Sequence, residues 1–125
     1  MKKLIAFFGS TAVILGALGA HALKDVLTPE SLASFKTGTT YHLVHTVALL
    51  PVLFRSEFKR SAQFFMLGIL LFSGSIYLLT LDDLMGVNLS FLGPVTPIGG
   101  LMFIAGWASI IAFQDSGSAT DVDKS

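Results

Sequence analysis

Three histidines are the residues of this 125-residue chain best suited to chemistry. His42 and His45 are three positions apart, so a helix would place both imidazoles on one face, and His21 could reach them from a neighbouring helix. Imidazole nitrogens are common ligands of zinc, copper and haem iron. A metal or haem site made by these three residues is therefore one hypothesis, although the apolar segments around them contain no carboxylate or cysteine to complete it.

Uncharged polar side chains give the histidines a second possible role. The other candidate residues are Tyr41, Ser73, Ser75, Tyr77 and Thr96. A hydroxyl of Ser73 or Ser75 could hydrogen-bond one histidine of the close pair and so join two helices. We favour this hydrogen-bonding role over a metal site, and we expect no cofactor.

Several kinds of chemistry have no support in the sequence. The chain has no cysteine, no Ser-His-Asp set, no nucleotide-binding loop and no HExxH motif, so we expect no enzyme activity. Its long apolar segments contain no charge of the kind that marks proton-coupled transport. Eight basic and eight acidic residues leave no net charge and no nucleic-acid footprint.

Composition shows which elements must position these residues. Hydrophobic residues make up 53% of the chain and charged residues 13%, about half of the roughly 25% usual in soluble domains. A helix needs about 20 apolar residues to cross a bilayer core of about 30 Å. The sequence therefore predicts an all-α integral membrane four-helix bundle. The predicted spans are about residues 4–23, 39–54, 61–81 and 95–113.

Two span boundaries have their own signals. Thr28, Pro29 and Glu30 form a helix start, with a hydroxyl cap followed by proline at the first position. We expect a short interfacial helix over residues 29–36 that breaks near Gly38 before the second span, with a single bent helix as the alternative. Thr96 is expected to cap the fourth span, with Pro97 at its first position.

Basic residues predict the orientation of the bundle. With four spans, both termini and the loop around residues 55–60 share one face, which carries six of the eight basic residues. We therefore predict that both termini are cytoplasmic. The histidines and most uncharged polar residues then fall toward the outer leaflet. Residues 1–114 form a single membrane domain, and residues 115–125 are expected to be a polar disordered tail.

Four ordered motifs resemble a known family. They are residues 16–23 (GALGAHAL), the Tyr-His pair at 41–42, residues 72–77 (FSGSIY), and residues 96–100 (TPIGG) continuing to Gly-Trp at 106–107. They resemble domain of unknown function family 423, which comprises small bacterial inner-membrane proteins with distant eukaryotic relatives. His45 lies outside the motifs that match. The residues at motif positions are His21, Tyr41, His42, Ser73, Ser75, Tyr77 and Thr96.

The resemblance implies a four-helix protein of the bacterial inner membrane and no particular activity. Our leading hypothesis is a non-enzymatic protein that binds membrane lipid, or packs against a partner protein or a second copy of itself, through an outer-leaflet polar cluster. The alternatives are a haem- or metal-binding redox or assembly factor that uses His21, His42 and His45, and an oligomeric small-solute channel or carrier with residues 96–100 at its mouth.

Overall fold

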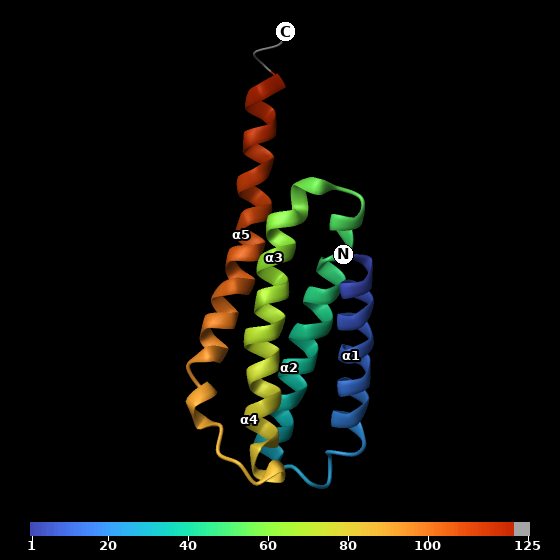
Figure 1. Ribbon diagram of the computed structural model, residues 1–125, viewed down its shortest axis with the longest axis vertical. Helices are drawn as coiled ribbons and strands as arrows, with labels where there is room; N and C mark the ends of the chain where they lie inside the picture. Colours follow the sequence, from blue (N-terminus) through green and yellow to red (C-terminus); the bar gives the residue numbers. More distant parts are fainter. Residues whose placement is uncertain (122–125) are drawn as a thin grey trace.

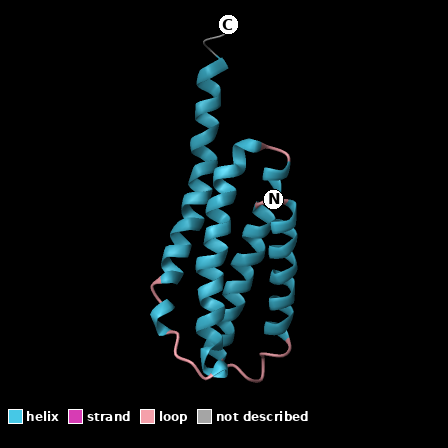
Figure 2. Ribbon diagram, viewed as in Figure 1, coloured by secondary structure: helices cyan, strands magenta, loops and turns pink. Residues whose placement is uncertain are grey.

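Four long helical segments run up and down beside one another in the computed structural model, which describes the backbone of residues 1–121 and the side chains of residues 1–112 (Figures 1 and 2). The segments are α1 (Lys2–Ala20), α2 (Pro29–Ala48), a composite of α3 (Lys59–Gly68), η3 (Ile69–Ser73) and α4 (Gly74–Met85), and α5 (Val95–Asp121). Short 3₁₀ turns, η1 (Leu50–Leu53), η2 (Ser56–Phe58) and η4 (Ser90–Leu92), lie in the connections. The predicted all-α four-helix arrangement is confirmed.

Three of the four segments are long and apolar enough to cross a membrane. They are Lys2–Ala20, Ser56–Met85 and Ser90–Ala112. Large apolar side chains point outward from them, such as Phe7 (61% exposed) and Ile104 (65% exposed), as expected where lipid replaces water. Helix α2 is more polar because it contains Glu30, Lys36 and two histidines. A membrane span at residues 39–54 therefore stays a prediction.

Helix α2 is continuous, so the predicted break near Gly38 is wrong. Its start is as expected: the Thr28 hydroxyl accepts a hydrogen bond from the Ser31 N–H at 3.2 Å, and Pro29 is the first helical residue. Gly38 lies in the middle of the helix and is buried against α4. A Cβ there would be 3.0 Å from Ile76 and 3.2 Å from Tyr77. The glycine thus permits close helix packing rather than a break.

The helices pack in the order α1, α2, α3–α4 and α5. Helix α1 packs mainly on α2, α2 also packs on η3 and α4, and α5 packs on α3 and η3. The buried apolar cluster joins all four segments. Its members are Ile5, Phe8, Leu49, Ala62, Phe65, Ile69 and Phe103.

Helix α5 approaches η3 very closely. This segment is one π-helical turn, wider than an α-helical turn, inside an otherwise α-helical span. Gly99 of α5 lies directly against it, because a Cβ at this position would overlap the backbone of Leu71 and Phe72. A small residue permits a similarly close contact at Gly68, where a Cβ would overlap the Phe103 ring.

Helix α5 begins one residue before Thr96, so the prediction that Thr96 caps this helix is wrong. The hydroxyl of Thr96 instead bonds a neighbouring helix. At its other end, α5 continues to Asp121 and overlaps the predicted polar tail of residues 115–125. Residues 122–125 lie outside the described residues, and the disorder of the tail stays a prediction.

Candidate functional site

His42 forms a buried pair with Tyr77 in the middle of the bundle. Its Nδ1 atom and the Tyr77 hydroxyl oxygen are 3.0 Å apart, and His42 is only 4% exposed. Phe8 of α1 packs edge-on against the imidazole, with ring centroids 6.0 Å apart. Helices α1, α2 and α4 therefore meet at this one side chain.

The second ring nitrogen of His42 has no partner. Its Nε2 atom is buried and makes no hydrogen bond within the part of the chain that the structure describes. The backbone of Phe8 lies close enough to interact with this imidazole. Buried polar atoms are rarely left unpaired, so His42 is the most unusual polar group in the interior.

His45 differs because both of its ring nitrogens are used. A carbonyl can only accept, so Nδ1 donates to the Tyr41 carbonyl at 2.7 Å. An indole N–H can only donate, so Trp107 Nε1 donates to His45 Nε2 at 3.1 Å. These two bonds define a neutral imidazole. The ring also stacks on Phe103, with centroids 3.6 Å apart and an interplanar angle of 14°.

The hydroxyl groups join helices, as expected, but through other partners than the histidines. The Ser73 hydroxyl donates to the Gly38 carbonyl at 2.8 Å and links η3 to α2. Ser75 and Thr96 share a hydrogen bond of 2.6 Å between α4 and α5. The expected bond from Ser73 or Ser75 to a histidine is absent among the described residues. Ser73 bonds the Gly38 carbonyl and Ser75 bonds the Thr96 hydroxyl, so each serine hydroxyl already has a partner on another helix.

His21 does not join the other two histidines. It ends α1 as an exposed residue, whereas His42 packs against Phe8, twelve residues from the end of that helix. Twelve residues of helix correspond to about 18 Å. No group of three histidine or acidic side chains suited to a metal ion occurs among the described residues. The hypothesis of a metal site shared by His21, His42 and His45 therefore gains no support from the described residues.

The histidine pair also lies at a different depth from the one expected. Because α2 already begins at Pro29, Tyr41, His42 and His45 lie in its last eight residues rather than at its start. That end of α2 leads into residues 49–58, which lie at the same end of the bundle as both termini (Figure 1). The polar residues thus form an interior layer around the middle of the helices. They do not gather at the predicted outer end.

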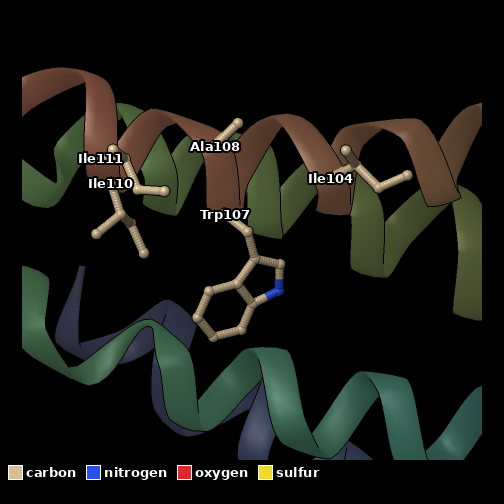
Figure 3. A pocket seen from close by; sticks show the side chains of 5 residues that line it. All are labelled: Ile104, Trp107, Ala108, Ile110 and Ile111. Atoms are coloured by element: carbon tan, nitrogen blue, oxygen red, sulfur yellow. The ribbon is translucent and has the colours of Figure 1, made fainter.

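An open groove beside this layer separates α2 from α5. It has a volume of about 390 Å³, and aromatic rings form most of its wall. The rings belong to Tyr41, His45, Phe72, Phe103 and Trp107. Figure 3 shows the Trp107 side chain reaching from α5 toward α2. Together with Ile104 and Ile111, Trp107 also borders an apolar hollow of about 520 Å³.

Tyr41 presents the free polar group of this groove. Its side chain is 43% exposed, and its ring packs on Phe72 at a centroid distance of 4.8 Å. Within residues 1–112 nothing hydrogen-bonds the Tyr41 hydroxyl. The sequence pointed to Tyr41, but it did not single out Phe103 or Trp107. The one tryptophan of the chain, next to the small Gly106, was the available signal.

Comparison with known proteins shows the family of this chain. It matches the family described as "Protein of unknown function (DUF423)" over residues 15–100. It belongs to this family. The DUF423 match includes the histidine pair, Tyr77 and the Thr96–Gly100 segment, whereas Trp107 lies beyond it. No solved structure matches the chain.

Its relatives are named as membrane proteins. A UPF0382 membrane protein of Haemophilus influenzae is 38% identical over 86% of both chains. YwdK of Bacillus subtilis is 36% identical over 80% of this chain and 83% of its own length. YgdD of Escherichia coli K12, named an inner membrane protein, is 37% identical over 85% of this chain and 82% of its own. The chain is thus a member of an uncharacterised membrane protein family.

Proposed function

We propose that this protein is a non-enzymatic component of the bacterial inner membrane that binds a membrane lipid in the groove between α2 and α5. The observation that carries the proposal is the free Tyr41 hydroxyl in an aromatic groove that opens to the side of the bundle. An acyl chain would pack on the rings, and the hydroxyl would donate to an ester oxygen of the lipid.

The interior polar layer, unlike the groove, has few polar groups left for a ligand. His45 bonds the Tyr41 carbonyl and the Trp107 indole, and the hydroxyls of Ser73, Ser75 and Thr96 bond one another or a backbone carbonyl. These side chains therefore stabilise the bundle and have little capacity left for a ligand. A groove of about 390 Å³ lies within the range of about 300–1,000 Å³ typical of small-molecule sites. Lipid binding therefore uses the groove rather than the polar cluster itself.

Filling the groove should displace the lipid. Gly100 lines it, and a Cβ there would be 3.8 Å from the Phe72 ring, so a longer side chain has room only in the groove. We expect Gly100→Leu to lower lipid affinity about tenfold or more, the effect of a steric cost of about 1–3 kcal/mol. Trp107, the only tryptophan, reports occupancy directly through quenching of its fluorescence by brominated phosphatidylcholine in mixed micelles.

The matched control is Gly16→Leu on α1, because a Cβ at Gly16 would have no atom within 4 Å. Its Trp107 quenching should equal that of the wild type. Tyr41→Phe should weaken binding without blocking the groove, since it removes only the hydroxyl. Equal quenching in Gly100→Leu and in the wild type would rule out this site.

We also propose that both termini face the cytoplasm. Basic residues concentrate at that end of the bundle, and cytoplasmic loops carry an excess of lysine and arginine. The chain has no cysteine, so single cysteines are clean probes. In intact cells, Ser56→Cys should be protected from an impermeant maleimide and Asn88→Cys should be labelled. The reverse pattern would show the opposite orientation.

A further inference from the structure

A second groove lies between α1 and α3. Helix α1 packs mainly on α2, which leaves an open apolar channel of about 500 Å³ along its other side. Leu4 and Phe8 form one wall, and Met66, Leu67 and Leu70 form the other. This second wall runs along α3 and the start of η3 from Gln63 to Leu70, about 10 Å of helix.

One end of this groove is strongly cationic. Lys2 and Lys3 begin α1, immediately before Leu4, and Lys59 and Arg60 begin α3, one turn before Gln63. All four side chains are exposed. Neither first helical turn contains an acidic residue.

The charge is specific to this end of the molecule. The nearby Glu57 is paired with Arg55 at 2.7 Å and so does not offset Lys2, Lys3 or Lys59. At the far end of the bundle, Lys24 and Lys36 alternate with acidic residues such as Asp25 and Glu30. An apolar channel with these three lysines at its mouth complements a molecule that has an acyl chain and a negative headgroup.

We propose that the groove between α1 and α3 binds an anionic phospholipid, with an acyl chain along Leu4, Phe8 and Leu67 and the phosphate among Lys2, Lys3 and Lys59. Gln63 lies between the two regions and can hydrogen-bond the glycerol esters. Basic residues near a membrane surface each attract anionic lipid by about 1 kcal/mol, which corresponds to about fivefold in affinity. This site is separate from the groove between α2 and α5, and the two proposals fail independently.

The test is native mass spectrometry of the purified full-length protein in detergent with phosphatidylglycerol or phosphatidylcholine added. Detergent removes any effect of the lysines on membrane orientation. The wild type should retain phosphatidylglycerol at least tenfold more strongly than phosphatidylcholine. The variant K2Q/K3Q/K59Q should lose this preference, whereas the control K24Q/K36Q, at the other end of the bundle, should keep it.

A second pair of variants separates the groove from general surface charge. Leu67→Phe fills the channel without changing any charge and should lower phosphatidylglycerol binding several-fold. Leu78→Phe makes the same change at a similarly exposed position, 44% against 47%, that does not line this groove, and it should have no effect. Equal binding of the two lipids by the wild type, or unchanged binding in Leu67→Phe, would overturn the proposal.

Discussion

Gly99→Ala is expected to separate α5 from the rest of the bundle and to be among the most damaging single substitutions in the chain. A Cβ at this position would overlap the backbone of Leu71 and Phe72 in η3, and backbone atoms cannot move aside as a flexible side chain can. Overpacking of a well-packed interior costs about 1–3 kcal/mol and more where no rearrangement is available. We expect a loss of about 3 kcal/mol or more in the free energy of unfolding, measured by SDS titration in mixed micelles with circular dichroism.

The neighbouring glycine provides the control. A Cβ at Gly100 would be 3.8 Å from the Phe72 ring, an ordinary contact, so Gly100→Ala should not destabilise the protein. The two substitutions have the same helix propensity gain, so their difference isolates the close approach to η3. Equal stabilities of the two variants would show that α5 does not seat on the π-helical turn as described.

The number and type of helices could be predicted because bilayer thickness fixes how long an apolar run must be. Three such runs give three of the long helical segments, and the shorter apolar run at residues 39–54 lies partly within the fourth, α2. The start of α2 was equally predictable, since a hydroxyl cap followed by proline satisfies the same local rule wherever it occurs. These features depend on near neighbours in sequence or on the thickness of the membrane alone.

The features that could not be predicted depend on which surfaces meet. A mid-chain glycine can break a helix or permit close packing, and only the presence of Ile76 and Tyr77 opposite Gly38 decides between the two. The predicted depth of the histidines in the bundle was wrong for the same reason. The sequence did not show that α2 runs unbroken from Pro29 to Tyr41. Their partners, Tyr77 and Trp107, lie 35 and 62 residues away in the chain.

The interior layer and the groove are coupled through one side chain. His45 belongs to the hydrogen-bonded layer through Tyr41 and Trp107, and it also forms part of the groove wall. Helices α2 and α5 approach each other through this imidazole and its stack on Phe103. The shape of the lipid site we propose therefore depends on His45, even though both its nitrogens are occupied.

His45→Ala is accordingly expected to have a large effect on both stability and groove. The side chain is 4% exposed, so its removal leaves a cavity, an unstacked Phe103 ring and an indole N–H without its acceptor. Large-to-small changes at buried positions cost about 2–5 kcal/mol. We expect a loss in that range by SDS titration, together with a shift of the Trp107 emission to shorter wavelength as the indole loses its hydrogen-bond acceptor.

Two further variants resolve the contributions. His45→Phe keeps a ring for Phe103 to stack on but removes both hydrogen bonds. Its loss of unfolding free energy should be about 0.6–1.7 kcal/mol, the range found for hydrogen bonds between membrane helices. His21→Ala alters an exposed residue at the end of α1 and should change neither stability nor emission. If His21→Ala and His45→Ala proved equally damaging, the separate roles assigned to the two histidines would be wrong. A difference of several-fold between them would show that His45, through Trp107 and Phe103, holds α5 against α2.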